Sequence, residues 1–324
     1  PARWMTVGYV FEQNDCLSFA VGTMIGVIMS EQLQAFWLEE EQRVVEMHAS
    51  DLYDFDAVAD SVANLASIGE SEERLFQTTG ILKVDEVFDP ASIAAAKTAL
   101  SDLVTDNFQG IQYGGVTAAE LQAMTTEQRL DSVRKFWNIA EADPRFSRLA
   151  TDPALLAVVS RLLGGAKPYM FQNGALVKPP QQGREKPWHQ DLSYFSMPED
   201  TPVVAIWLAL DPATPENGCM RVIEGQGNGG LAPIPHFQVR DWQICDRDFR
   251  DLRGQEQRPR VLVAPLAPGG GLFFSGLAPH GTPHNNSGQR RRAVQLWWCP
   301  EDAPHWEPAE RQAVWGGEAR GQEC

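Results

Sequence analysis

The sequence predicts a mainly β protein with flanking helices (α+β), whose core is a double-stranded β-helix, that is, a jelly roll of the cupin type. Beyond Pro168, short apolar runs recur between Pro and Gly residues, which is the pattern of many short strands joined by turns. Before Pro168 the pattern is helical, so the helices are expected to flank this β core. The expected strands are residues 169–177, 203–210, 220–223, 261–266, 271–275 and 293–298.

The N-terminal residues 1–70 have a different composition, rich in Met, Ala and Glu, with helical periodicity at residues 31–38 and 51–65. We expect a helical N-terminal extension there, and the sequence assigns it no role. Residues 71–324 are expected to form one domain, with the jelly roll at about residues 168–300.

One strand and two helices are expected ahead of the β core. Residues 81–84 form an apolar run after Gly80 and indicate a strand. Asp89 is expected to cap a helix that begins at Pro90 and runs to about Val104, because Pro is favoured at the first helical position. A second helix is expected over residues 153–163, and the Gly pair that follows ends it.

The charge of the chain limits its partners. There are 27 Lys and Arg residues against 43 Asp and Glu, which gives a net charge of −16 and a pI near 4.8. Such an excess of negative charge disfavours nucleic acid and anionic membrane surfaces as partners, because both are polyanions. An anionic small molecule would need a local basic site. The sequence does not indicate an oligomeric state.

Cysteine usage and hydropathy bear on the compartment. The five cysteines are scattered and odd in number, without CxxC spacing, so they indicate neither a disulfide framework nor a zinc site. We therefore expect a reducing, cytoplasmic location. The apolar run at residues 19–29 has about half the length of a membrane span and no basic segment before it, so no membrane segment or signal peptide is expected.

A metal site is the most specific functional signal. If His189, Gln190 and Asp191 lie on a β-strand, His189 and Asp191 point to the same face and offer an imidazole and a carboxylate to one metal. Two His and one carboxylate on one side of a metal suit non-haem Fe(II) oxygenases. His280, just after the expected strand at residues 271–275, is the candidate for the third ligand.

A basic cluster follows His280. Because neighbours on a strand face opposite ways, only one of Arg291 and Arg292 can point into the core. A planar guanidinium pairs with a carboxylate through two hydrogen bonds, so an inward Arg291 could hold the distal acid of a dicarboxylate such as 2-oxoglutarate. Arg290 and Arg292 are expected to be solvated surface charges.

Beyond these single residues, the chain resembles the phytanoyl-CoA dioxygenase family of Fe(II)/2-oxoglutarate oxygenases over roughly residues 80–300. One departure from the family follows Ile223. The family usually continues with Pro-Gly-Ser-His at this place, whereas this chain continues with Glu224-Gly225-Gln226-Gly227 and lacks the Ser and the His. The resemblance is carried by Trp188-His189-Gln190-Asp191-Leu192, by residues 216–223, by residues 270–274, and by residues 280–291 with His280-Gly281-Thr282 and Arg291.

The resemblance implies site residues and cosubstrates. His189, Asp191 and His280 match the Fe(II) ligands, Arg291 matches the arginine that binds 2-oxoglutarate, and O₂ is the second cosubstrate. In the family, the residue four positions after this arginine often carries a hydroxyl that also binds the 2-oxoglutarate carboxylate, whereas in this chain that residue carries an amide. The further positions implied at the cosubstrate pocket are Trp207, Gln172, Lys178 and this amide, Gln295.

Candidates for substrate contacts are less specific. Tyr194 and Phe195 follow the metal motif, and His236 and Trp242 lie in the loop region where this fold usually receives substrate. Trp297, on the strand after Arg291, could line a pocket, although aromatic residues on strands are more often part of the core.

The expected function is therefore oxidation, by default hydroxylation, of an unactivated C–H bond of a small organic substrate, with release of succinate and CO₂. Two other classes stay open. A hydrolase or isomerase could use the same three ligands for zinc or manganese without needing Arg291, and a non-catalytic binding protein could retain the fold. The sequence identifies neither the substrate nor a role for coenzyme A.

Overall fold

Eight strands form the largest sheet in the computed structural model, which describes residues 53–181, 185–223, 225, 232–234, 236–240, 243–246 and 260–315. The six strands expected in the β core are all confirmed, four in this sheet and two in a smaller one. Every residue of β8 is buried because both faces of the sheet are covered. In spatial order the strands are β2 (Ser61–Asn64), β3 (Ile81–Glu86), β13 (Gly271–Ser275), β8 (Val204–Ala209), β15 (Arg291–Pro300), β6 (Pro168–Lys178), β5 (Val133–Trp137) and β4 (Ile111–Tyr113).

A smaller sheet of five strands lies on the other side of the core, and within the described residues the two sheets do not close into a barrel. Side chains from both sheets share one apolar cluster, with Trp207, Phe274 and Trp297 from the large sheet and Val222 and Leu262 from the small one. The small sheet has the order β1 (Ala57–Val58), β12 (Val261–Ala264), β9 (Met220–Ile223), β14 (His280–Thr282) and β7 (Lys186–His189). A separate hairpin joins β10 (His236–Arg240) to β11 (Gln243–Asp246).

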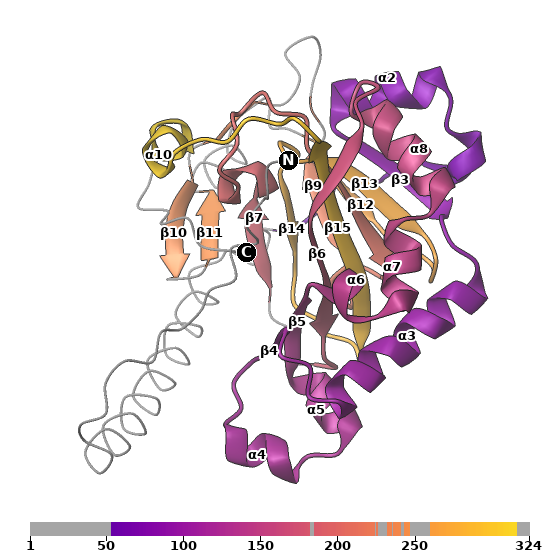
Figure 1. Cartoon of the computed structure of the whole chain (residues 1–324), viewed down its shortest axis with the longest axis vertical. Helices are drawn as coiled ribbons and strands as arrows, with labels where there is room; N and C mark the ends of the chain where they lie inside the picture. The colour runs from indigo at the N-terminus through magenta and orange to yellow at the C-terminus, as the bar shows by residue number, and fades with distance from the viewer. Residues whose placement is uncertain are drawn as a thin grey trace, which may run out of the picture. The chain divides into compact units, whose positions relative to one another are not determined.

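Helices cover the outer face of the large sheet and bury a second apolar cluster against it. Figure 1 shows several of them along one side of that sheet, with β7 and β14 on the other side. The helices are α2 (Glu70–Thr79), α3 (Pro90–Thr105), α4 (Ala118–Ala123), α5 (Thr126–Ser132), α6 (Ile139–Ala142), α7 (Pro144–Ala150) and α8 (Pro153–Leu162), and α10 (Pro308–Trp315) follows the last strand.

The two helix predictions are confirmed together with their ends. The Asp89 carboxylate accepts a hydrogen bond from the Ser92 amide at 2.7 Å, and Pro90 is the first residue of α3. Gly164 and Gly165 follow α8 with φ of 73° and 89°, the left-handed conformation that ends a helix.

The helical expectation for residues 51–65 is wrong where the structure describes them. Residues 57–58 and 61–64 form the short strands β1 and β2, followed by the 3-10 turn η1 (Leu65–Ser67). β1 pairs with β12 and β2 with β3, so distant partners decide the conformation of this segment. Residues 1–50 of the predicted extension lie outside the described residues.

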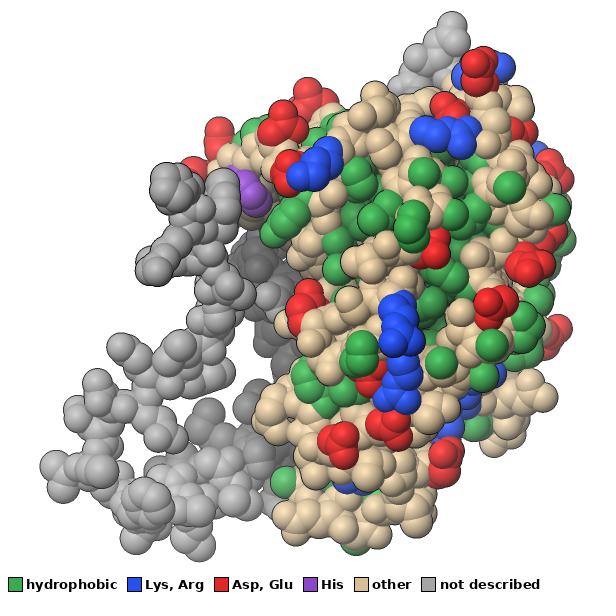
Figure 2. Space-filling view, turned by 45° about the vertical axis from the view of Figure 1, so that its right-hand side comes forward, with side chains coloured by type: hydrophobic (Ala, Val, Ile, Leu, Met, Phe, Trp, Pro, Cys, Tyr) green, Lys and Arg blue, Asp and Glu red, His purple; other side chains and the backbone are tan. Residues whose placement is uncertain are grey.

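Surface features agree with a chain that carries net negative charge. On the face drawn in Figure 2, acidic side chains are scattered over the surface, and Lys and Arg side chains lie among them, with one short row of basic side chains near the centre. None of the described helices has both the length and the apolar character needed to span a bilayer.

Candidate active site

The metal motif lies where a strand of the small sheet ends. His189 is the last residue of β7, and Asp191 is the first residue of the 3-10 helix η2 (Asp191–Tyr194). The expectation that both lie on one strand is therefore wrong, because the chain turns when the Ser193 amide and hydroxyl both bond the Gln190 carbonyl, at 3.1 and 2.7 Å. Gln190 itself stays extended and separates the two candidate ligands.

Strand pairing brings in the third residue. β14 runs antiparallel to β7, and His280 lies directly opposite His189. The ligand atoms of His189, Asp191 and His280 all lie within 4.8 Å of one another, and all three residues are buried. Asp191 Oδ1 lies 3.3 Å from His189 Nε2 and 3.6 Å from His280 Nε2. Residues 91 positions apart in the chain thus form one compact donor set, called the triad below.

Backbone carbonyls orient both imidazoles. His189 Nδ1 lies 2.7 Å from the Pro187 carbonyl oxygen, and His280 Nδ1 lies 3.0 Å from that of Ala278. Because each Nδ1 donates its hydrogen to a carbonyl, each Nε2 is left with a lone pair that faces the other donors. Burial lowers the pKa of His280 to about 4, and the neighbouring His189 adds to this. A neutral ring is the form that binds a metal.

Two side chains of the large sheet orient the carboxylate. Asp191 Oδ2 accepts hydrogen bonds from Trp297 Nε1 at 2.6 Å and from Gln295 Nε2 at 3.3 Å. Burial raises the pKa of Asp191, but the nearby rings of His280 and His189 and the Trp297 hydrogen bond outweigh it and hold the pKa below its ordinary value. The triad therefore offers two imidazoles and one carboxylate, a donor set that fits Fe(II).

Arg291 lies on the same face of β15 as Gln295 and Trp297, because it is four and six residues away from them. Its side chain is buried, its Cζ lies 4.9 Å from the centre of the Trp207 ring, and its Nη1 donates to the Gly218 carbonyl. Its Nε has no hydrogen-bond partner, and it forms no ion pair with any described residue. Burial lowers the pKa of Arg291 to about 10, and a buried cation of this kind fits a carboxylate ligand.

Lys178 is a second buried cation beside it. β6 and β15 place Lys178 directly opposite Arg291, and its Nζ donates to the carbonyls of Thr282 and Pro283. Burial, and then the charge of Arg291, hold the pKa of Lys178 well below its ordinary value. The pair of basic side chains makes this part of the core favourable for an anion such as the distal carboxylate of 2-oxoglutarate.

Comparison with known proteins then decides the family. The sequence model of phytanoyl-CoA dioxygenase (PhyH) matches residues 76–293. The chain belongs to the phytanoyl-CoA dioxygenase family. As a member with the triad assembled, it is a 2-oxoglutarate-dependent non-haem iron dioxygenase.

Two curated relatives illustrate the likeness. The chain is 28% identical to the ectoine dioxygenase of Sphingopyxis alaskensis over 68% of its own length and 72% of that protein. It is 26% identical to the human peroxisomal phytanoyl-CoA dioxygenase over 58% of its own length. The chain covers 54% of the human enzyme, that is, about half of its length.

Solved structures share the fold. The apo form of EctD from S. alaskensis superposes with a TM-score of 0.60 and 20% identity, covering 78% of this chain and 85% of that one. EvdO2 from Micromonospora carbonacea var. aurantiaca, crystallised with 2-oxoglutarate, gives a TM-score of 0.57 and 21% identity, covering 79% and 99% of the two chains.

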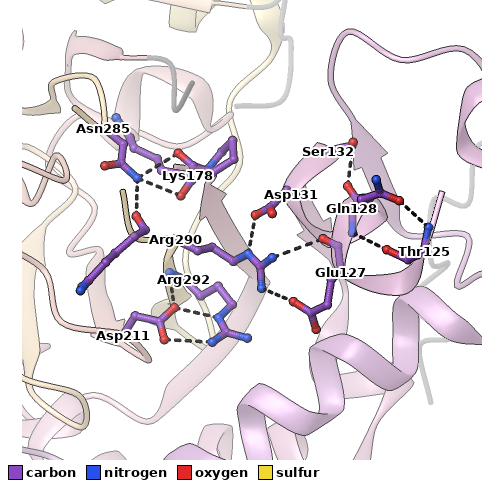
Figure 3. A network of polar contacts seen from close by, with 12 residues as sticks. Thr125, Glu127, Gln128, Asp131, Ser132, Lys178, Asp211, Asn285, Arg290 and Arg292 are labelled. Carbon is purple, nitrogen blue, oxygen red and sulfur yellow. Dashed lines mark hydrogen bonds and ion pairs between the residues drawn. The ribbon is translucent and has the colours of Figure 1, made fainter. Parts of the chain in front are cut away.

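The neighbouring arginines of this dioxygenase correct one expectation. Arg290 and Arg292 were expected to be solvated, but both form ion pairs, which Figure 3 shows. Arg292 holds Asp211 through two nitrogens at 2.7 and 2.9 Å. Arg290 contacts Asp131 at 2.5 Å and Glu127 at 2.9 Å. Both point away from the face that carries Arg291.

The other positions implied at the cosubstrate pocket also face the core. Trp207 lies opposite Gln295 in the sheet, and Gln172 lies opposite Trp297 at an irregularity in β6. The Gln172 side-chain nitrogen is buried and has no hydrogen-bond partner among the described residues. Gln295, expected to share the cosubstrate carboxylate, has its amide on Asp191 in this structure.

The four candidates for substrate contacts differ in their positions relative to the triad. Tyr194 lies beside the triad, with its ring 5.7 Å from that of His189, and Phe195 packs edge-on against Phe171 at 4.7 Å. His236 is instead committed to backbone groups: its Nδ1 bonds the Ile234 carbonyl at 2.5 Å, and its Nε2 accepts from the Gln190 amide at 2.9 Å. Trp242 lies outside the described residues.

The sequence did not indicate the contacts that three residues near the site make. The Gln190 side chain bonds the backbone of Ala232, Ile234 and Leu277, which fixes the turn between the two metal-ligand positions. Trp297 bonds Asp191, and Gly218 presents its carbonyl to Arg291. The Asn217-Gly218 pair indicated a turn, but nothing local indicated what the turn contacts.

Proposed function

We propose that this dioxygenase hydroxylates an unactivated C–H bond of a small organic substrate, with release of succinate and CO₂. One observation carries the proposal: a buried triad suited to Fe(II) is linked by hydrogen bonds to Gln295 and Trp297 of β15, the strand that also carries the buried Arg291, which has no ion-pair partner among the described residues. Arg291 lies roughly 13 Å along β15 from Gln295, at about 3.3 Å per residue, so the anchor and the metal end are separate.

Iron and 2-oxoglutarate, when bound, supply the oxidising chemistry, in which O₂ and the keto acid yield succinate, CO₂ and one oxygen atom inserted into the substrate C–H bond. The protein residues have other tasks. His189, His280 and Asp191 would hold the metal from one side and leave the opposite side open for the keto acid and O₂. Arg291 would fix the distal carboxylate, so that the keto end is directed to the metal.

The surroundings would exclude bulk water from this chemistry. His280 packs against Phe274, with ring centres 4.6 Å apart, and His189 packs against Tyr194. The triad and Arg291 are all at most 4% exposed. In a site of low polarity the charge-assisted contacts of Arg291 and Asp191 are stronger than they would be in water.

The first test is spectroscopic. Under anaerobic conditions, the protein with Fe(II) and 2-oxoglutarate should show the weak visible charge-transfer band of a chelated keto acid, and Asp191→Ala should abolish it. A protein that binds zinc tightly, gives no such band and turns over substrate under nitrogen would instead be a non-oxidative metal enzyme. A protein that binds neither iron nor 2-oxoglutarate would be a binding protein on this fold.

The substrate pocket is proposed to lie between the triad and the segment around Tyr194 and Phe195. Phe195→Ala should lower substrate oxidation more than it lowers succinate formation in the absence of substrate, because we infer that the residue contacts substrate and not the keto acid. Equal loss of both activities would place the substrate elsewhere. This is measured by quantifying succinate and oxidised substrate in the same reaction.

The proposed location is a reducing compartment such as the cytoplasm. Cys219 and Cys299 are buried free thiols, which supports this. The substrate is proposed as a small molecule of unassigned structure. Neither the described surface nor the site gives reason to assign coenzyme A to it.

A further inference from the structure

The two oxygens of Asp191 have different surroundings. Oδ1 faces the imidazoles, 3.3 Å from His189 Nε2 and 3.6 Å from His280 Nε2. Oδ2 faces the large sheet, where it accepts hydrogen bonds from Trp297 Nε1 at 2.6 Å and Gln295 Nε2 at 3.3 Å. A carboxylate can bind a metal through one oxygen or through both, and these contacts favour binding through Oδ1 alone.

We propose that Trp297 and Gln295 are positioning residues that restrict Asp191 to ligation through Oδ1 and keep Oδ2 away from the metal. The inference rests on the proposed function, because it concerns how the same iron site is kept open. If Oδ2 also bound the metal, it would occupy a coordination position that the keto acid or O₂ requires.

The fold makes these contacts rigid. Trp297 and Gln295 are 1% and 6% exposed, and both point to the interior because they are two residues apart on β15. β15 lies between β6 and β8, so neither backbone position is free to shift. An indole N–H has only donor capacity, and Asp191 Oδ2 is its hydrogen-bond partner in this buried setting.

The contact also crosses the molecule. Asp191 follows β7 of the small sheet, whereas Trp297 belongs to the large sheet on the other side of the core. The orientation of the carboxylate is therefore set by an element that contributes no metal ligand. Hydrogen bonds from outside the ligand set commonly affect metal affinity by about 10–100-fold.

Trp297→Phe is the principal test, because it removes the N–H and keeps an aromatic ring. Because Asp191 loses the hydrogen bond that orients its carboxylate before the metal binds, the apparent Kd for Fe(II), measured anaerobically, should rise by about 10–100-fold. At saturating Fe(II) and 2-oxoglutarate the charge-transfer band should be weaker than in the unsubstituted protein, because a carboxylate that binds through both oxygens displaces one atom of the keto acid. Gln295→Leu should act in the same direction with a smaller effect, as its hydrogen bond is longer.

Trp298→Phe is the matched control. Trp298 is the next residue on the same strand and is 1% exposed, but it belongs to the apolar cluster on the helical side of the sheet. The Trp298→Phe substitution removes the same atoms as Trp297→Phe, but Trp298 makes no hydrogen bond to Asp191. Both the iron affinity and the charge-transfer band of this variant should therefore match those of the unsubstituted protein.

The outcomes separate the possibilities. If Trp297→Phe and Gln295→Leu both bind Fe(II) and give the band as the unsubstituted protein does, the positioning role is wrong. If Trp298→Phe weakens iron binding and the band as much as Trp297→Phe, the effect is one of packing and the role is also wrong. If the unsubstituted protein itself gives no band, the proposed function has failed before the variants are compared.

Discussion

At the scale of single residues, the period of a β-strand separates the roles of three adjacent arginines. The expectation that Arg291 and Arg292 face opposite ways agrees with the structure, in which Arg291 is buried in the core and Arg292 pairs with Asp211. What lies on each side could not be predicted, because Asp211 and Glu127 come from segments 81 and 163 residues away.

Arg291→Ala should raise the 2-oxoglutarate concentration needed for half-maximal succinate formation by at least about tenfold, which corresponds to losing roughly 1.4 kcal/mol of binding. The reason is that a buried guanidinium, which pairs with no acidic side chain in the described part of the chain, would lose a charge-assisted contact to the distal carboxylate. Iron affinity should be unchanged, because Arg291 has no contact with the triad.

Arg290→Ala and Arg292→Ala are the matched controls for that measurement. Both should keep the 2-oxoglutarate dependence of the unsubstituted protein, while each lowers stability by about 1 kcal/mol through loss of a partly exposed ion pair. A larger effect on 2-oxoglutarate at Arg292 than at Arg291 would contradict the assignment of the anchor.

The triad and its supporting contacts differ in how far they follow from sequence. Two of the three residues form a short motif whose spacing brings them together in almost any extended or turning backbone, so His189 and Asp191 could be predicted. The hydrogen bond from Trp297 to Asp191 spans 106 residues and depends on how two sheets pack. No local pattern contains that information, which is why Trp297 was expected to line a pocket or to pack in the core, and not to bond a metal ligand.

At the scale of elements, local signals predicted the ends of helices and the strands of the core, because caps and glycines act over a few residues. These local signals failed where the conformation of a segment depends on pairing with residues that are distant in the sequence. Residues 57–58 are a strand only because they lie beside Leu262 and Val263. Likewise β7 stops at His189 because η2 begins, and Leu192 bonds the Gly276 carbonyl at 2.9 Å.

The turn at Gly218 gives a prediction at this scale. Gly218 has φ of 80°, and a Cβ there would clash with the Pro283 carbonyl oxygen, which also accepts from Lys178. Gly218→Ala should destabilise the fold by about 1–3 kcal/mol and raise the 2-oxoglutarate requirement, because the carbonyl that holds Arg291 must move.

Denaturant midpoints and succinate kinetics measure the two effects. Gly165→Ala is a useful comparison, since this glycine also has positive φ but its Cβ would meet open space far from the site. It should share the loss of stability without the change in 2-oxoglutarate requirement. An equal change in both variants would show that Gly218 matters only through backbone strain.

The His236 contact predicts a dependence on pH. Burial lowers the pKa of His236 to about 3, whereas in the unfolded chain it has its ordinary value near 6.5. Between these values the unfolded state binds one more proton, so the free energy of unfolding decreases as pH falls from about 6.5 toward 3.

His236→Gln removes this titration. The variant should be less stable at pH 7, but its melting temperature should fall less between pH 7 and pH 5 than that of the unsubstituted protein. Buried His280 titrates in both proteins and therefore cancels in the comparison. Identical slopes for the two proteins would mean that His236 is not kept neutral by the fold.

At the scale of the whole molecule, the site joins the two sheets. The small sheet provides both histidines, and the large sheet provides Arg291 and the contacts to the carboxylate. The fold class followed from the repeated short strands, but which strands face each other did not, since this depends on the order of strands in each sheet and not on any single segment.

Ligand binding should consequently stabilise the whole described domain. The stabilisation by 2-oxoglutarate should depend on Fe(II) being bound first. A ligand that binds only the folded state adds about 2.7 kcal/mol at 100 times its Kd, which is on the order of 5 °C in melting temperature for a chain of this size. Anaerobic Fe(II) alone should raise the melting temperature, and 2-oxoglutarate should add a further increase only when the metal is present, because its keto end needs the metal. Asp191→Ala should lose both increments, whereas Arg291→Ala should keep the first and lose most of the second. Thermal scans of the three proteins with and without each ligand measure this, and an increase caused by 2-oxoglutarate in Asp191→Ala that equals the one in the unsubstituted protein would show that the acid binds independently of the triad.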